Sequence, residues 1–433
     1  MILMIVVLSC FSSEAEAQVV DVAPVWAGHP VGFCLLTQPP HQFVAFYDAN
    51  RQMTVAQRTL DSTEWTFTYL PEHVGWDSHN SITMIIDDSD QLHLTGNMHG
   101  DPLKNFRTTR PLDSKSFERV ESMVGENEQR ATYPHFVRGP DDQLLFTYRD
   151  GGSGNGNQIW NAYNLETQRW SRLLDKPLVD GRGKMNAYFN GPLQGPDGYW
   201  HLSWVWRDTP DCATNHDPSY ARSRDLVHWE RSDGPPLLLP ITFETAEIVD
   251  SVPSGGGVIN GNVRLGFDAQ NRVTVAYHKY DENGFTQTYL ARRENDEWKK
   301  YRITDWDYRW NFSGNGSIGT FEVGVHPLEV ENGRPVLAWR HAKFGSQRWR
   351  LDADTLKPVE RLPNPPSKIP AELRKVRSTF PGVGVRFRDD SGRAESDGVT
   401  YVLRWETLGA NRDRPRAKPW PAPSTLQVIR IQE

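Results

Sequence analysis

The chain has 433 residues, of which 37% are hydrophobic, and its formal net charge at pH 7 is −7. This length is enough for a large hydrophobic core, and the negative charge, without any Lys/Arg run, argues against a nucleic-acid partner. Apart from a short apolar run at the N-terminus, no stretch approaches the length of a membrane span. The 34 Gly, 30 Pro and 16 Trp residues favour β-structure with many turns.

The N-terminal segment is typical of an export signal. Residues 2–8 form a short apolar run, and residues 15–17 (Ala-Glu-Ala) fit the small-x-small pattern of a cleavage site, although no basic residue precedes the run. A lipoprotein-type cleavage before Cys10 is the alternative, and it would leave a lipid anchor there. We therefore expect a leader over residues 1–17 and a secreted, periplasmic or cell-surface protein whose single domain spans residues 18–433.

One apolar strand pattern recurs along the chain and indicates a repeat architecture. Most copies follow a turn rich in Gly, Asp and Asn, and most precede a second strand. The copies lie at residues 43–48, 92–97, 144–149, 200–206, 273–279, 335–341 and 400–406. A single unit could not bury both faces of its small sheet, whereas radial packing of seven units would do so. Without any long 3.6-residue periodicity, this pattern predicts an all-β, seven-bladed β-propeller.

Two further features fit a propeller. Several repeats end with an Asp/Ser-containing turn followed by a tryptophan, which resembles the Asp-box of sialidase-like propellers and is interpreted as blade packing. These tryptophans are Trp65, Trp170, Trp229 and Trp298. The last apolar segment, residues 426–432, predicts a strand that closes the ring by pairing with the first blade.

Residues 76–106 predict a β-hairpin that would bring two histidines together. Apolar runs at residues 82–86 and 92–94 flank the turn-rich segment DDSDQ. Because a hairpin folds its two ends back to one sheet edge, His79 and His99 should lie close to each other. One histidine at a strand end is commonly a surface or capping residue, but two that meet, each near an Asn, are equally compatible with a functional site.

Strand ends and inter-blade loops are expected to place polar side chains at one mouth of the propeller. They include His79, Asn80, His99, Tyr133, Arg149, Tyr188, Asn190, Arg207, His278 and Arg340. No pair of carboxylates stands out, as a standard glycosidase would require, and no nucleophile elbow is present. His, Tyr, Arg and Asn instead suit β-elimination at a uronic acid, where one group takes the C5 proton, another protonates the leaving oxygen and Arg binds the carboxylate. For each residue alone, a structural position at the rim is the alternative.

A short loop holds two candidate metal ligands, Cys212 and His216. A thiolate and an imidazole suit zinc, but two ligands do not make a site, and His278 is a candidate third ligand from another repeat. The alternative is a buried free cysteine with a surface histidine. The proposed elimination would need no cofactor.

Several segments carry a family resemblance. They are residues 76–108, 132–156, 186–192, 198–211 and 214–229. Together they resemble the BNR-repeat-containing β-propeller family that includes the ulvan lyases of polysaccharide lyase families 24 and 25. The resemblance covers residues 20 to 300 well and the last third loosely.

This resemblance implies a polysaccharide lyase that cleaves between sulfated rhamnose and a uronic acid. It implies His79 as the catalytic acid or base, Tyr188 as its partner and Arg207 as the group that neutralises charge. His99 would bind the substrate carboxylate. The further substrate-binding candidates are Asn80, Arg149, Asn190 and His278. The family also implies a structural zinc near the loop with Cys212 and His216.

The expected protein is therefore a monomeric lyase acting on an acidic, rhamnose-rich polysaccharide such as ulvan and leaving a 4,5-unsaturated uronate end. Two alternatives stay open. One is an α-L-rhamnosidase or rhamnosyl-glucuronate lyase acting on arabinogalactan-type glycans, and the other is a non-catalytic glycan-binding propeller. The reaction product would separate them, because only elimination creates a C=C bond.

Overall fold

The computed structural model describes residues 16–393 and 395–432, and these residues form an all-β protein. The described residues contain no α-helix and four 3₁₀ turns. These are η1 (Ser114–Ser116), η2 (Pro140–Asp142), η3 (Cys212–Thr214) and η4 (Ala371–Arg374). The expected leader lies outside the described residues up to residue 15, as does Cys10, so the leader and the lipid anchor stay predictions. None of the described helices has the length and apolar character needed to cross a membrane.

Seven antiparallel sheets follow one another within the described residues. The first contains β2 (Cys34–Gln38), β3 (His41–Tyr47), β4 (Gln52–Thr59) and β5 (Thr66–His73). The second contains β6 (Thr83–Ile86), β7 (Leu92–Thr95), β9 (Asn105–Thr108) and β10 (Phe117–Val120). The third contains β8 (His99–Asp101), β11 (Ala131–Arg138), β12 (Leu144–Gly152), β13 (Asn155–Asn164) and β14 (Arg169–Arg172).

The remaining four sheets complete the chain. The fourth contains β15 (Asn186–Gln194), β16 (Trp200–Arg207), β17 (Asn215–Ser223), β18 (Trp229–Glu230) and β19 (Glu247–Ile248). The fifth contains β20 (Arg264–Phe267), β21 (Val273–Tyr280), β22 (Thr286–Glu294) and β23 (Glu297–Arg302). The sixth contains β24 (Val323–Val325), β25 (Glu329–Glu331), β26 (Arg334–His341), β27 (Gly345–Leu351) and β28 (Pro358–Leu362). The seventh contains β29 (Val383–Asp389), β30 (Val399–Leu408), β31 (Ser424–Gln432) and β1 (Glu16–Val25).

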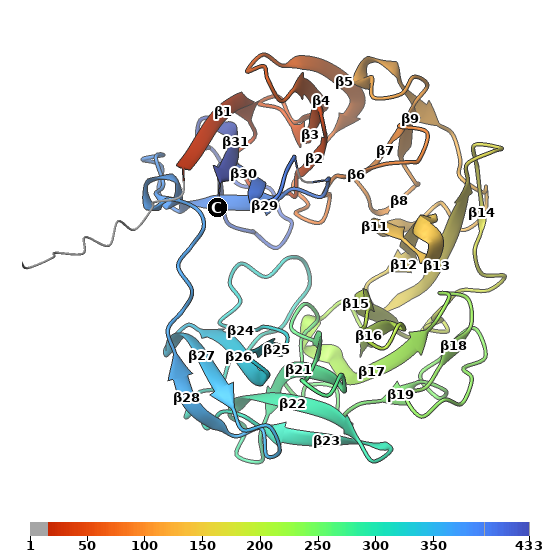
Figure 1. Cartoon of the computed structure of the whole chain (residues 1–433), viewed down its shortest axis with the longest axis vertical. Helices are drawn as coiled ribbons and strands as arrows, with labels where there is room; N and C mark the ends of the chain where they lie inside the picture. Colours follow the sequence, from red (N-terminus) through yellow and green to blue (C-terminus); the bar gives the residue numbers. More distant parts are fainter. Residues whose placement is uncertain (1–15, 394, 433) are drawn as a thin grey trace, which may run out of the picture.

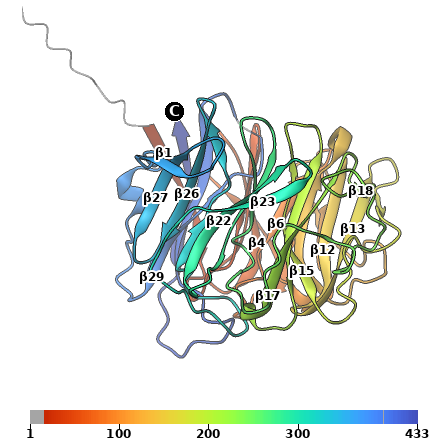
Figure 2. The ribbon, with the colours of Figure 1, turned by 90° about the horizontal axis from the view of Figure 1, so that it is seen from below.

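The sheets are arranged in chain order around a common centre (Figure 1). Turned by 90°, the molecule shows strands of neighbouring sheets lying face to face (Figure 2). The seven recurring apolar segments overlap β3, β7, β12, β16, β21, β26 and β30, one in each sheet. The prediction that each repeat forms one small sheet is therefore confirmed.

The hydrophobic core lies between neighbouring sheets. One cluster joins Phe43 of the first sheet, Leu94 of the second and Leu403 of the seventh, and all three side chains are fully buried. The recurring tryptophans serve the same packing. Trp298 of the fifth sheet donates its indole N–H to Glu247 of the fourth sheet over 2.7 Å, as expected for a residue that packs repeats together.

The two ends of the described chain meet in the seventh sheet. β31 pairs antiparallel with β1, with Val19 opposite Ile429. The predicted strand at residues 426–432 is therefore confirmed, but its partner belongs to the last sheet and not to the first, because β1 precedes the strands of the first sheet. The seventh sheet contacts the first, since Asp390 Oδ1 accepts a hydrogen bond from the backbone N–H of Thr37 over 2.9 Å.

Replacement of a core residue in β31 by a smaller one should weaken the packing of the seventh sheet against the first and second sheets. Leu426 is fully buried in the cluster shared by the first, second and seventh sheets. Leu426→Ala should lower the free energy of unfolding by about 2–5 kcal/mol, because it removes apolar burial and leaves a cavity. Chemical denaturation measures the change. The matched control, Leu238→Ala, alters a side chain that is 83% exposed and should change stability by less than about 0.5 kcal/mol. Equal effects would show that the closing strand adds no packing energy.

Candidate active site

The second sheet begins with the predicted hairpin. β6 and β7 pair antiparallel, with Thr83 opposite Thr95 and Ile86 opposite Leu92. The rings of His79 and His99, one at each end of this hairpin, lie 4.2 Å apart between centroids. The prediction that the hairpin brings the two histidines together is confirmed.

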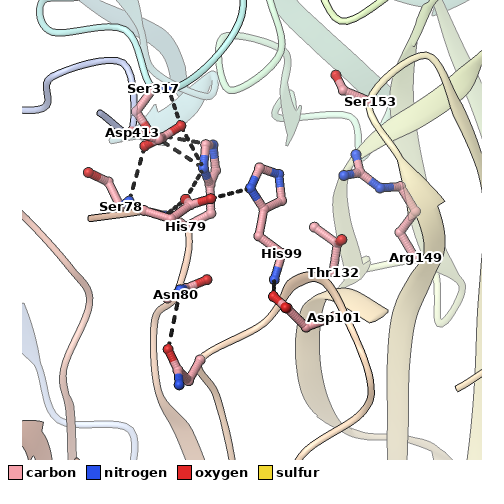
Figure 3. Close-up of polar contacts among 12 residues, drawn as sticks. Ser78, His79, Asn80, His99, Asp101, Thr132, Arg149, Ser153, Ser317 and Asp413 are labelled. Carbon is pink, nitrogen blue, oxygen red and sulfur yellow. Dashed lines mark hydrogen bonds and ion pairs between the residues drawn. The ribbon is translucent and has the colours of Figure 1, made fainter. Parts of the chain in front are cut away.

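A carboxylate holds the two imidazoles side by side. Asp77 Oδ1 lies 2.7 Å from Nδ1 of His79, and Asp77 Oδ2 lies 2.6 Å from Nδ1 of His99. A second carboxylate, Asp413, approaches the same nitrogen of His79 at 3.3 Å. Figure 3 shows Asp413 and Ser317 on the side of His79 that faces away from His99. His79 is therefore clamped between two carboxylates that come from distant parts of the chain.

These contacts shift the pKa values of His79 and Asp77. Burial alone would lower the pKa of His79, but the hydrogen bonds to Asp413 and Asp77 outweigh it and raise this pKa to about 9. Burial alone would raise the pKa of Asp77, but the hydrogen bonds to His79 and His99 lower it well below its ordinary range. At neutral pH, therefore, His79 is an imidazolium beside ionised carboxylates.

Backbone donors hold Asp413 in place. The backbone N–H of Ser317 donates to Asp413 Oδ2 over 2.7 Å, and that of Ser78 donates to Oδ1 over 3.1 Å. Asp413 lies in the connection between β30 and β31. Further along the same connection, Trp420 packs against Trp76 with ring centroids 5.4 Å apart. The connection is thus tied to the segment that carries His79.

Tyr133 lies between the histidines and a second tyrosine. Its ring centroid is 5.7 Å from that of His79 and 6.0 Å from that of Tyr188. Its φ of 53° is rare for a bulky residue, and the pairing of β11 with β12 is irregular between Thr132 and His135. The backbone is therefore strained at the point where the ring enters the site.

Tyr188 lies on β15 among polar and cationic groups. Its hydroxyl is 2.7 Å from Ser153 Oγ, and Arg207 Nη1 donates to it over 3.3 Å. The Arg149 guanidinium lies 5.4 Å from its ring centre. Burial alone would raise the pKa of Tyr188, but the charges of Arg149 and Arg207 outweigh it and lower this pKa. The site therefore favours the phenolate form of Tyr188 more than water does.

Arg149 has unused donors. The residue is 2% exposed, and its Nε donates to the Gly151 carbonyl over 3.3 Å. Its two terminal nitrogens make no hydrogen bond to any described residue. A buried guanidinium with free donors is well suited to binding an anionic group.

Two adjoining cavities bring these residues together. The larger, of about 1130 Å³, is lined by Asp77, His79, His99, Tyr133, Tyr188 and Arg207, among others. The second, of about 820 Å³, is lined by Arg149 and also by His79, Tyr133 and Tyr188. A molecule in the larger cavity would therefore contact the clamped imidazole and the activated phenol together.

Three predicted substrate-binding residues lie away from both cavities. Asn80 lies behind His79, where its amide donates to Asn97 over 3.2 Å and links the two ends of the hairpin. Asn190 accepts a hydrogen bond from the backbone N–H of Leu265 over 3.0 Å, which joins the fourth and fifth sheets. His278 is buried 5.3 Å from the ring centre of Trp310. The structure therefore gives these three residues packing and bridging contacts.

Among the described residues, the predicted zinc ligands Cys212, His216 and His278 do not form a group of three ligand atoms close enough to share one metal ion. Both ring nitrogens of His216 face carboxylates, Asp217 at 2.7 Å and Asp208 at 3.0 Å, and Cys212 is buried in an apolar cluster. Among the described residues, only Asp77, His79 and His99 form a group of three ligand atoms within 4.8 Å of one another, a spacing that could hold a metal ion. The residues at Cys212 and His216 do not fit a closed zinc site in this arrangement.

Several residues of the site were missed or undervalued from sequence. Asp77 precedes His79 by two residues, a spacing that hints at a local hydrogen bond. Tyr133 is one of the ten polar residues predicted at the mouth of the propeller, and nothing in the sequence distinguishes it from the other nine. Asp413 lies in a Pro/Arg-rich segment 334 residues beyond His79 and carries no motif.

The ring of sheets with its polar cavity defines a repeat protein of the all-β class. The sequence profile of the BNR repeat-containing family matches residues 41–306, and the chain belongs to this family. The match contains His79, His99, Tyr188 and Arg207 but ends before Asp413.

Curated relatives and solved structures agree with this family. The chain is 24% identical over 255 residues to the short isoform of ulvan lyase from Alteromonas sp. (strain LOR), covering 52% of this chain and 45% of that protein. It is 23% identical over 230 residues to the long isoform from Pseudoalteromonas sp. (strain PLSV), covering 48% of this chain and 22% of that protein. The aligned part thus spans less than half the length of these relatives.

Two solved structures share the fold. The polysaccharide lyase Uly1 superposes with a TM-score of 0.60 at 14% identity, over 97% of this chain and 99% of that one. A PL25 ulvan lyase superposes with a TM-score of 0.56 at 14% identity, over 91% and 94% of the two chains. At this level of identity the likeness concerns the fold.

Removal of the Asp413 charge should lower the pKa of His79. Asp413→Asn keeps the size of the side chain but removes one of the two carboxylates that stabilise the imidazolium. We expect the pKa to fall from about 9 toward the ordinary histidine value, as measured by NMR titration of the imidazole. The matched control is Asp225→Asn, whose partner is the exposed His228, and it should leave the His79 titration unchanged. An unaltered His79 titration in Asp413→Asn would contradict the clamp.

Proposed function

We propose that the protein is a polysaccharide lyase that cleaves an acidic, rhamnose-containing glycan such as ulvan by β-elimination. One observation carries this proposal: a tyrosine whose pKa is lowered and a histidine whose pKa is raised line one cavity, beside a buried arginine with free donors. The similarity of the chain to ulvan lyases supports the same reaction. The product would carry a 4,5-unsaturated uronate at its new end.

For the architecture, we propose that the seven sheets are the blades of a seven-bladed β-propeller that forms one catalytic domain. The repeat of one apolar segment per sheet and the pairing of β31 with β1 support this arrangement. The cavities contain residues from several sheets, which favours one domain as the catalytic unit. An extracellular glycan as substrate also agrees with the expected export of the chain.

In the proposed reaction, Tyr188 is the base. Its phenolate takes the C5 proton of the uronic acid, which is weakly acidic because it lies next to the carboxylate group. Arg149 and Arg207 stabilise the phenolate before transfer. As negative charge develops on the substrate carboxylate, the free donors of Arg149 and the imidazole of His99 are placed to bind it.

His79 is the proposed acid. The electrons of the broken C5–H bond form the C4=C5 double bond, and the C4–O bond breaks. The leaving oxygen takes a proton from the His79 imidazolium, so that one proton is removed and one is supplied. Asp77 and Asp413 keep His79 charged until that step. Only side chains of this protein take part.

The same cavity is poorly suited to glycoside hydrolysis. That reaction needs one protonated carboxylic acid and a second carboxylate as nucleophile or base. Among the described residues that line the larger cavity, the carboxylates are Asp77 and Asp413, and both are bound to His79. In both, burial is outweighed by hydrogen bonding to imidazole, which lowers the pKa. Neither can serve as the protonated acid, so elimination is favoured over rhamnosidase activity.

Loss of either proton-transfer group should abolish most of the activity on ulvan. Tyr188→Phe and His79→Ala should each lower kcat by about 10²–10⁴-fold, because each removes one partner of general acid–base catalysis. The assay follows the ultraviolet absorbance of the new C=C bond. The matched control Tyr69→Phe removes the hydroxyl of a tyrosine that is 60% exposed and outside both cavities, and it should keep full activity. Wild-type activity in Tyr188→Phe would exclude the assigned base.

A further inference from the structure

The larger cavity carries more positive charge than the proposed elimination uses. Six arginines line it: Arg207, Arg340, Arg386, Arg388, Arg412 and Arg414. None of the six forms an ion pair with a carboxylate anywhere in the described part of the chain. The two lining carboxylates, Asp77 and Asp413, both contact His79, whose single positive charge offsets one of their two negative charges. The cavity is therefore basic in a chain whose net charge is −7.

Three of these arginines are held by the protein itself. Arg207 donates to Tyr188 at the proposed elimination centre. Arg340 donates to the carbonyl of Phe321, and Arg412 donates to the carbonyl of Asn315 over 3.3 Å. Their positions are fixed by hydrogen bonds to backbone carbonyls and to the Tyr188 hydroxyl.

The other three arginines have free guanidinium groups. Arg386, Arg388 and Arg414 are exposed, and across residues 16–393 and 395–432 their side chains make neither a hydrogen bond nor an ion pair. We call these three residues the basic wall. Several arginines elsewhere in the chain are paired with acids, as with Arg404 and Glu406 at 2.6 Å. Free cations gathered on one cavity wall repel one another unless an anion lies between them.

The fold places the basic wall beside the clamped histidine. Arg386 and Arg388 are two residues apart on β29, so they project from the same face of the strand at a spacing of roughly 7 Å. Arg414 directly follows Asp413, the residue that contacts His79. The basic wall thus includes the residue next to the carboxylate that holds the proposed acid, together with two residues of β29 that line the same cavity.

The basic wall is also separate from the family match. The proposed catalytic residues His79, Tyr188 and Arg207 lie within residues 41–306, whereas all three wall residues lie beyond that range. Changes in the last third of the chain could therefore alter glycan binding while the elimination centre stays the same.

We propose that Arg386, Arg388 and Arg414 form an oxyanion-binding subsite for the charged groups of sugar residues that flank the cleaved bond. This inference rests on the proposed lyase function and names how that substrate is selected. The ligand chemistry is a sulfate ester or a uronate carboxylate, because the planar guanidinium donates two parallel hydrogen bonds to either group. The subsite sets affinity for a polyanionic glycan and leaves the proton transfers to His79 and Tyr188.

The test compares two double variants with equal loss of charge. Arg386→Ala/Arg388→Ala removes two wall cations. Arg334→Ala/Arg361→Ala is the matched control, because these arginines are exposed on β26 and β28 and line neither cavity. On ulvan, the wall variant should raise KM by about 10-fold or more and change kcat by less than about twofold, since charged hydrogen bonds made equally in ground and transition states are lost. The control should leave both constants unchanged.

Chemically desulfated ulvan identifies the anionic group. A rise in KM on native ulvan that disappears on desulfated ulvan assigns the subsite to sulfate esters. An equal rise on both assigns it to uronate carboxylates. Wall and control variants with the same KM on native ulvan would overturn the proposal.

A binding measurement separates this inference from the lyase proposal. Calorimetry of ulvan binding in the Tyr188→Phe background, with and without the wall substitutions, needs no turnover. If wild-type protein binds ulvan without forming unsaturated product, the lyase proposal fails, and the subsite still stands if the wall substitutions weaken that binding about 10-fold or more. Unchanged binding in the wall variant would refute the subsite whatever the enzyme activity.

Discussion

The antiparallel pairing of β31 with β1 is the constraint on which the remaining structure depends, because it brings both ends of the described chain into one sheet. That sheet lies against the first one, where Ser391 donates to the Leu35 carbonyl over 2.8 Å. The connection that leads into β31 must then pass close to the segment before β6. Asp413 contacts His79 through this passage, so the connection that leads into the paired strand also supplies a residue of the candidate site.

The site separates two kinds of titratable group. On one side, carboxylates surround imidazole, which raises the pKa of His79. On the other side, guanidinium groups surround a phenol, which lowers the pKa of Tyr188. Tyr133 fills the space between the two sides. Environments that shift a base and an acid in opposite directions are the arrangement that proton-transfer enzymes require near neutral pH.

Much of this fold could be predicted because its signals are local. A strand with its turn and following tryptophan occupies one repeat, so the recurrence of apolar segments was enough to assign one sheet to each. The hairpin around residues 82–94 was equally local, and it brought His79 and His99 together as expected. The apolar pattern predicts the strand at residues 426–432 but not its partner β1 in the seventh sheet, because the order of strands between sheets is not encoded in either segment alone.

The candidate site was less predictable, because its contacts are long-range. Asn190 has the residue type and strand position of a substrate ligand, yet its amide joins two sheets. His278 is a histidine that packs in the core beside Trp310. Asp413 and Arg414 lie in a Pro/Arg-rich segment that carries no motif. Their importance depends on which distant segments they contact in the folded chain, and neither a motif nor a spacing in the sequence shows those contacts.

The most direct measurement of the central claim is the fate of solvent oxygen during ulvan cleavage. Digestion in water enriched in heavy oxygen, followed by mass spectrometry, should give products without label, because elimination breaks the C4–O bond and leaves the original oxygen on rhamnose. Product incubated alone in the same water corrects for slow exchange at the reducing end. One heavy oxygen at each new reducing end would show hydrolysis and would contradict the account.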